Sequence, residues 1–256
     1  MNILSAISYP SRRMSYRVAL VRLALGLARH WLVILNLLLF IWVGLPWLAP
    51  VFMHLGWAKA AQAIYFLYSL QCHQLPERSF FLFVKQTMYS LPEIQKAWRA
   101  TDDLLVLRQF IGNLQMGWKV AWSDRMVAMY TSTFLFSLLY GFVRKRLKPL
   151  SLWGFALLLL PMAVDGGTHL VSDLAGIGHG FRDSNAWLMT LTGNILPSTF
   201  YAGDALGSFN SWARLVTGVL FGMAVVWLAY PYVQDSFADL ASVYQDKLRK
   251  AGLETK

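Results

Sequence analysis

Four long apolar runs alternate with polar connections along the sequence. Residues 31–53, 126–143, 149–164 and 215–233 contain no charged side chain. A bilayer core about 30 Å thick requires about 20 apolar residues in a helix. We therefore predict an all-α, polytopic helical membrane protein with about four transmembrane helices. We expect the third helix, whose uncharged run is short, to continue past Asp165.

Residues 57–71 are helical in composition but short, and Lys59 and Gln62 interrupt them. Basic loops favour the cytoplasmic side of a membrane. With a cytoplasmic N-terminus, four crossings place the basic loop 144–148 inside, whereas a fifth crossing would place it outside. We therefore interpret 57–71 as an interfacial or re-entrant helix, with five crossings as the alternative.

The same pattern predicts three regions. Residues 1–30 form an N-terminal amphipathic segment at the membrane interface, residues 31–233 a single helical membrane domain, and residues 234–256 a polar C-terminal tail with a short amphipathic helix. Pro46 and Pro50 are expected to kink the first span, which membrane helices tolerate.

Composition supports the membrane assignment. Hydrophobic residues make up 57% of the 256 residues and charged residues only 14%, against roughly 25% in soluble domains. The net charge of +10 comes from basic residues beside the apolar runs, which favours anionic lipid headgroups over nucleic acid. We predict a multi-pass cell-membrane protein with both termini cytoplasmic. The single cysteine excludes an intramolecular disulfide.

The first candidate site is the segment 71–81. Pro76 disfavours helix at the residue before it, so a helix should end near residues 72–74. This end presents a thiol, an imidazole, an amide, a guanidinium and a hydroxyl that suit a metal, a phosphate headgroup or another polar ligand. The residues are Cys72, His73, Gln74, Arg78 and Ser79. The alternative is a helix end whose His and Arg satisfy the last carbonyls.

A second candidate surrounds Asp165. This acid ends an uncharged run, and the spacing of Asp165, His169 and Asp173 places all three on one helix face. An ionisable residue at membrane depth indicates function by default. The alternative is an ion pair with Arg182 or Arg214 that only stabilises the bundle.

Two further segments flank the spans. Residues 117–125 are typical of an interfacial Trp–Lys anchor, with Ser123 or Asp124 as the N-cap of the following span. In residues 182–185, Arg182 can hold a carboxylate or phosphate, or neutralise Asp165.

A local repeat joins this segment to the last span. The pattern Asn-x-Trp with Thr-Gly occurs at Asn185 and again 25 residues later, at Asn210. We interpret it as a duplication that adds a helical hairpin-like insert. Under the four-crossing topology, all the polar clusters, including Ser123 and Arg214, lie at the extracytoplasmic face.

These segments resemble a bacterial and archaeal family of membrane proteins catalogued as a domain of unknown function. The specific pattern is Cys-His-Gln-x-Pro-x-Arg-Ser at residues 72–79. Three further blocks, at residues 117–125, 162–168 and 182–218, are similar to the family's other motifs. The resemblance covers roughly residues 60–233 and implies no established activity.

The sequence departs from the family pattern at three places. Ser123 stands where many relatives have a second cysteine, which excludes a two-cysteine site here. His169 replaces the usual glutamine. The last motif is split by the duplication, so that Arg182 and Arg214 come from different copies.

We hypothesise a polar, outward-facing pocket that binds and modifies a lipid-like or anionic molecule. Arg78, Arg182 and Arg214 would hold an anionic group, with Gln74, Ser79, Ser123 and Asn185 as further binding residues. Asp165 with His169 would act as acid and base, and Cys72 with His73 as nucleophile. The sequence identifies no cofactor, and a metal on Cys72, His73, Asp165 and His169 is an alternative that we do not favour. The rival function is a non-enzymatic accessory or assembly subunit of a larger membrane complex.

Overall fold

The computed structural model describes residues 12–253. The predicted N-terminal segment and C-terminal tail therefore extend into residues 1–11 and 254–256, which lie outside the described residues. The long helices are α1 (Arg12–His54), α5 (Asp124–Val143), α6 (Leu152–Asp173) and α10 (Phe209–Lys250). The short ones are α2 (Ala58–Ser69), the 3-10 helix η1 (Pro76–Arg78), α3 (Leu91–Ala97), α4 (Leu104–Leu107), α7 (Phe181–Ser184), α8 (Ala186–Leu191) and α9 (Ser198–Tyr201).

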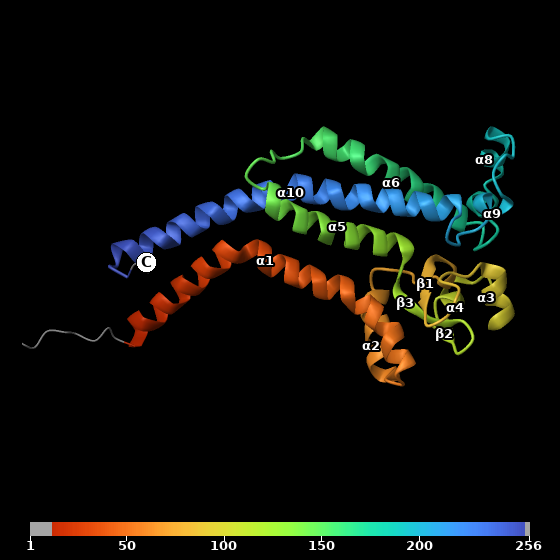
Figure 1. The fold of residues 1–256 in the computed structure, drawn as a ribbon, viewed down its shortest axis with the longest axis horizontal. Coiled ribbons are helices and arrows are strands. Elements are labelled where there is room, and N and C mark those ends of the chain that lie inside the picture. The colour runs from red at the N-terminus through yellow and green to blue at the C-terminus, as the bar shows by residue number, and fades with distance from the viewer. Residues whose placement is uncertain (1–11, 254–256) are drawn as a thin grey trace, which may run out of the picture.

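The four long helices are the membrane spans. Each is long and apolar enough to cross a bilayer. They run side by side, and the loops and short elements gather at one end of the bundle (Figure 1). We call this the sheet end, because a small β-sheet lies there. The start of α1 and the end of α10 lie at the opposite end, which agrees with four crossings. The predicted all-α polytopic fold is confirmed.

Helix α1 bends where the interfacial segment was predicted to meet the first span. His30 has non-helical torsions (φ −111°, ψ 17°), whereas Pro46 and Pro50 lie within the helix. The break therefore falls at His30 and not at the two prolines. Similarly, α10 runs through the predicted tail as one helix of 42 residues with Pro231 inside it, so no separate tail helix begins at residue 234.

Helix α2 has 12 residues, too few to span a bilayer. It packs beside the end of α1 at the sheet end (Figure 1). This arrangement matches the expected interfacial helix at residues 57–71.

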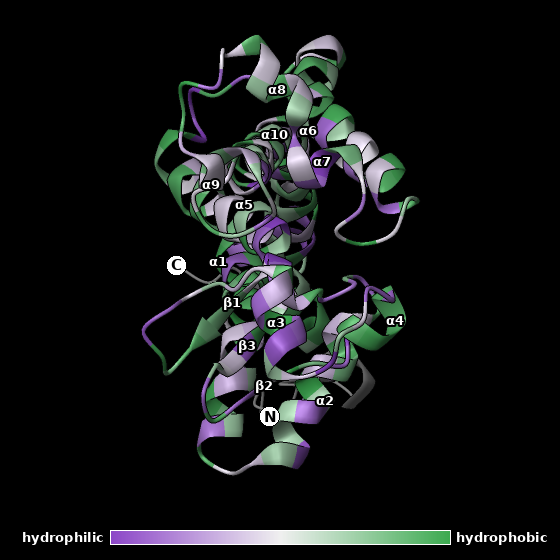
Figure 2. Cartoon of the chain, turned by 90° about the vertical axis from the view of Figure 1, so that its right-hand side faces the viewer, coloured by the Kyte–Doolittle hydropathy of each residue, from purple (hydrophilic) through white to green (hydrophobic). Residues whose placement is uncertain are grey.

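The sheet end contains a three-stranded antiparallel sheet that the apolar and polar pattern does not predict. Its strands are β1 (Ser79–Leu82), β2 (Gly112–Asn113) and β3 (Gly117–Ser123), in the order β1-β3-β2. Lys119 and Trp122 lie in β3 and are fully buried. The predicted Trp–Lys anchor at the membrane interface is therefore wrong, because these side chains form part of a protein core. Figure 2 looks onto this end, where hydrophilic and hydrophobic residues alternate over the short elements.

Small residues bring α5 and α10 close together. A Cβ atom on Gly218 would lie 2.6 Å from Cβ of Ala128, and one on Gly222 would overlap Oγ of Ser132. The Ser132 hydroxyl also donates to the carbonyl of Gly218 at 3.1 Å. This Gly-x-x-x-Gly spacing allows close backbone approach between membrane helices, and it places the sheet-end residues of α10 beside those of α5.

Candidate functional site

A cavity of about 380 Å³ opens at the sheet end of the bundle, between the loop after α2 and the spans α5, α6 and α10. We call it the polar cavity. Its lining residues are Gln71, Cys72, His73, Gln74, Leu75, Arg78, Leu104, Ser123, Arg125, Met126, Met129, Gly166, His169, Leu170, Asp173 and Arg214. Segments far apart in the sequence therefore meet at one site.

The Cys-His-Gln motif forms a tight loop between α2 and η1. The Cys72 thiol is almost buried, 3.5 Å from the hydroxyl of Ser123, and it accepts the backbone N–H of Gln74 at 3.4 Å. Gln74 itself has a positive φ of 54°, and its side chain donates to the carbonyl of Tyr65 at 2.9 Å. The loop thereby places His73, which is exposed, at the cavity.

Lys119 holds this loop against the sheet. Its buried ammonium donates to the carbonyls of Gln74 at 2.6 Å and Arg108 at 3.0 Å. Burial lowers the pKa of Lys119 to about 7. Glu77, in η1, is equally buried, and burial raises its pKa to about 7. Both carboxylate oxygens of Glu77 lack a hydrogen-bond partner among the described residues.

At the polar cavity, four arginines and four aspartates form two ion-paired groups, which His169 joins into one network by its contacts with Asp165 and Asp204. The pairs are Arg78–Asp173 (2.7 Å), Arg78–Asp204 (2.8 Å), Arg125–Asp165 (2.8 Å), Arg182–Asp165 (2.7 Å), Arg214–Asp124 (2.8 Å) and Arg214–Asp204 (2.6 Å). Buried charges require such partners, because an unpaired ion in a low dielectric is costly. The network links α5, α6 and α10 to the short elements at the sheet end of the bundle.

His169 lies at the centre of this network. Its Nδ1 is 3.1 Å from the carbonyl of Asp165, and its Nε2 is 3.5 Å from Nη1 of Arg214 and 3.6 Å from Asp204. The face shared by Asp165, His169 and Asp173 on α6 is as predicted, and the predicted pairing of Asp165 with Arg182 is present.

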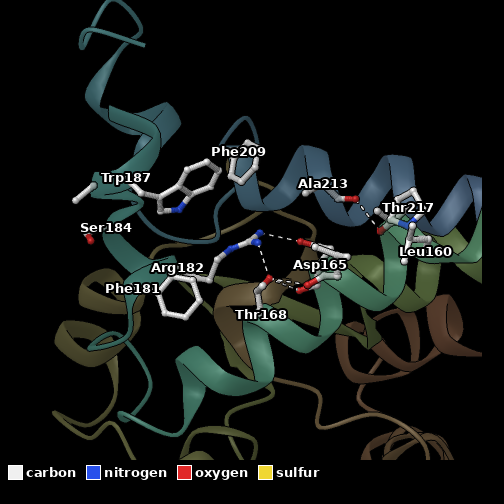
Figure 3. Close-up of a pocket in the computed structure, with 13 residues that line it drawn as sticks. Leu160, Asp165, Thr168, Phe181, Arg182, Ser184, Trp187, Phe209, Ala213 and Thr217 are labelled. Carbon is white, nitrogen blue, oxygen red and sulfur yellow. Dashed lines mark hydrogen bonds and ion pairs between the residues drawn. The ribbon is translucent and has the colours of Figure 1, made fainter. Parts of the chain in front are cut away.

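A second cavity, of about 810 Å³, lies on the opposite side of α6. We call it the apolar cavity (Figure 3). It is lined by Leu160, Pro161, Val164, Asp165, Thr168, Phe181, Arg182, Ser184, Ala186, Trp187, Phe209, Ala213 and Thr217. Asp165 joins the two cavities: one oxygen contacts Arg182 of the apolar cavity and the other contacts Arg125 of the polar cavity.

The site residues predicted from the sequence are thus divided between the two cavities, and two of them line neither. Those in the polar cavity are Cys72, His73, Gln74, Arg78, Ser123, His169 and Arg214. Asp165 and Arg182 line the apolar cavity. Ser79 and Asn185 line neither, and both are fully buried. The Ser79 hydroxyl donates to Leu75, and the Asn185 amide donates to the carbonyls of Arg182 and Tyr201.

Sequence reasoning missed three members of the network: Arg125, Asp124 and Asp204. The first two directly precede the uncharged run of α5, a position where charges are ordinary. Asp204 lies in a glycine- and serine-rich loop without periodicity. Among residues 12–253, no three His, Cys, Asp or Glu side chains are grouped as a metal site would require.

The two copies of the local repeat meet in space but differ in structure. Asn185 precedes the six-residue helix α8, whereas Asn210 lies in the first turn of the 42-residue α10. The side-chain amide of Asn185 lies 3.3 Å from Oδ1 of Asn210, which also accepts from Nε of Arg182. Both asparagines therefore contact Arg182 of the ion-pair network. The residues between them form short helices and not a regular helical hairpin.

Four spans closed at one end by paired charges define a polytopic helical membrane protein. Residues 114–228 match the family described as "Predicted membrane protein (DUF2085)", which confirms the resemblance to a membrane-protein family of unknown function. "Uncharacterized protein MJ1492" of Methanocaldococcus jannaschii is 29% identical over 174 residues, 65% of this chain and 85% of that protein. No solved structure matches the chain. The motif at residues 72–79 lies outside the family match, and its assignment to the family stays a prediction.

Proposed function

We propose that this membrane protein binds an anionic, lipid-like molecule by its headgroup in the polar cavity. The observation that carries the proposal is the mixed lining of this cavity. Arg78, Arg125 and Arg214 line it together with a single carboxylate, that of Asp173. A guanidinium presents five N–H donors in a geometry that suits carboxylate and phosphate oxygens.

Apolar side chains complete the lining on the side of the spans. Met126 and Met129 come from α5, and Leu170, from α6, is 67% exposed. An exposed leucine on a membrane helix contacts lipid, so the cavity borders on the hydrocarbon region. A ligand with a polar head and an apolar body matches this combination better than a free polar solute does.

Cys72 and His73 are the reactive groups that this cavity offers to a bound headgroup. Cys72 supplies a thiol next to Ser123, and His73 an exposed imidazole. The ring nitrogens of His169 face the Asp165 carbonyl, Arg214 and Asp204. We therefore assign proton transfer to His73 and headgroup positioning to His169.

The charge distribution supports an extracytoplasmic position for the cavity. The basic loop 144–148 joins α5 to α6 at the end opposite the sheet (Figure 1). By the positive-inside rule this end faces the cytoplasm, together with both termini. The sheet end and the polar cavity then face outward.

The test is to purify the protein in mild detergent and identify co-purifying molecules by extraction and mass spectrometry. We expect at least one anionic amphiphile per chain, and about one equivalent fewer in His169→Gln. Glutamine fits this position in the family pattern, so the variant should fold. His179→Gln is the matched control, because His179 is exposed and lies outside the polar cavity.

Absence of any bound amphiphile from the wild-type protein would refute the proposal. A stoichiometric protein partner in its place would favour the accessory-subunit alternative.

A further inference from the structure

The apolar cavity is a second, separate site, and its position determines which ligands can enter it. It lies between α6 and α10, and α7 and α8 cover its sheet end. Leu160 and Val164 line it from α6 and are both more than half exposed on a membrane span. A ligand can therefore enter it from the bilayer. At about 810 Å³ it has the size of sites that hold one small ligand.

One end of the cavity is charged. The Arg182 guanidinium, only 7% exposed, is held by Asp165 at 2.7 Å, Thr168 at 2.9 Å and Asn210 at 3.1 Å, and it lies 5.2 Å from the ring centre of Phe209 (Figure 3). These bonds use three of its five N–H donors. Two donors have no acceptor among the described residues, although buried donors are normally satisfied.

The network is neutral as a whole but not at this end. Within residues 12–253, Asp165 is the only carboxylate paired with Arg182, and it is shared with Arg125. This group of three carries one surplus positive charge. The remaining members are two arginines and three aspartates, which carry one surplus negative charge. The positive group borders both cavities, the apolar one through Arg182 and the polar one through Arg125, and an anion is favoured beside it.

We propose that the apolar cavity binds one long-chain lipid with an anionic head. The chain lies along Leu160, Val164 and Ala213, and a headgroup oxygen accepts the two remaining N–H donors of Arg182. The head is a phosphate or a carboxylate, since a guanidinium recognises both. This site lies across α6 from the polar cavity and does not depend on what binds there.

Native mass spectrometry of the delipidated protein tests the proposal, with phosphatidic acid, a long-chain fatty acid and phosphatidylcholine offered at equal concentration. We expect anionic lipid to be retained about tenfold over phosphatidylcholine, with one equivalent held in the apolar cavity. Retention of phosphatidic acid identifies a phosphate head, and retention of the fatty acid a carboxylate. Equal retention of all three lipids would mean only annular lipid and would overturn the proposal.

Two substitutions on α6 locate the site. Val164→Trp fills the cavity and should reduce anionic-lipid retention about tenfold. Leu157→Trp is the matched control, because Leu157 is also more than half exposed on the same helix but does not line the cavity. Equal retention by the two variants would contradict the assigned site. Arg182→Gln should abolish the preference for anionic heads, and the tryptophan pair remains decisive if that variant fails to fold.

Discussion

The Sγ atom of Cys72 lies 3.5 Å from the Oγ atom of Ser123, although 51 positions separate the two residues. Cys72 belongs to the loop that follows α2, and Ser123 is the N-cap of α5. This contact attaches the motif loop to the start of a membrane span. It thereby fixes the thiol in the lining of the polar cavity.

The contact predicts that Ser123→Cys forms a disulfide with Cys72. The bond would close a loop of about 50 residues and stabilise the protein by about 4 kcal/mol on the chain-entropy estimate. Thiol titration after mild oxidation, with peptide mapping, measures the bond. Two free thiols in the folded variant would show that the loop lies elsewhere.

Asp165 is expected to be essential for stability, because Arg125 and Arg182 share it. Asp165→Ala leaves the buried guanidinium of Arg182 and the partly buried one of Arg125 without a carboxylate and should destabilise the protein by about 3–5 kcal/mol. Asp246→Ala is the control, because its pair with Arg249 is exposed and should contribute at most about 1 kcal/mol. Thermal unfolding in detergent compares the two, and similar melting temperatures would be evidence against a buried network.

Close packing of α5 on α10 makes Gly222 intolerant of a side chain. A Cβ atom there would overlap Oγ of Ser132 and lie 2.5 Å from the backbone nitrogen of Thr133. Gly222→Ala should therefore cost about 1–3 kcal/mol through overpacking. Gly44→Ala, on α1, meets nothing within 4 Å and should be neutral or stabilising. Equal unfolding temperatures for these variants would contradict the α5–α10 contact.

The buried Glu77 should make the free energy of unfolding depend on pH. Burial raises its pKa from 4.5 to about 7, so the folded protein holds a proton that the unfolded chain releases. The stabilisation is complete below the unfolded pKa and is lost as pH rises through about 7. Lys119 contributes little in this range, because it is mostly protonated in both states until pH approaches its folded-state pKa of about 7.

We therefore expect the free energy of unfolding to fall by about 2 kcal/mol between about pH 5 and pH 7. The Glu77→Gln variant should lack this slope, because glutamine does not titrate. Denaturant unfolding at both pH values provides the measurement. A wild-type slope that persists in the variant would assign it to another group.

The spans could be predicted because the signal is local. Each uncharged run near residues 31–53, 126–143, 149–164 and 215–233 identifies a helix without knowledge of its neighbours. The shared location of the polar motifs followed from topology alone. In the structure Cys72, His169 and Arg214 line one cavity, whereas Asp165 and Arg182 line another.

Long-range pairing could not be predicted in the same way. Arg78 and Asp204 are 126 positions apart, and neither residue specifies the other in a single sequence. Lys119 resembled an interfacial anchor because Trp and Lys are frequent at membrane surfaces. Only the strand β3, which pairs on both sides with β1 and β2, shows why this lysine is buried.

The proposed binding of an amphiphile in the polar cavity can be measured at Cys72, the only cysteine in the chain. The rate of its alkylation by N-ethylmaleimide is compared between delipidated protein and protein refilled with its native lipid extract. We expect about tenfold slower alkylation in the refilled protein, and little change in His169→Gln. Equal rates with and without the lipid extract in the wild-type protein would contradict it.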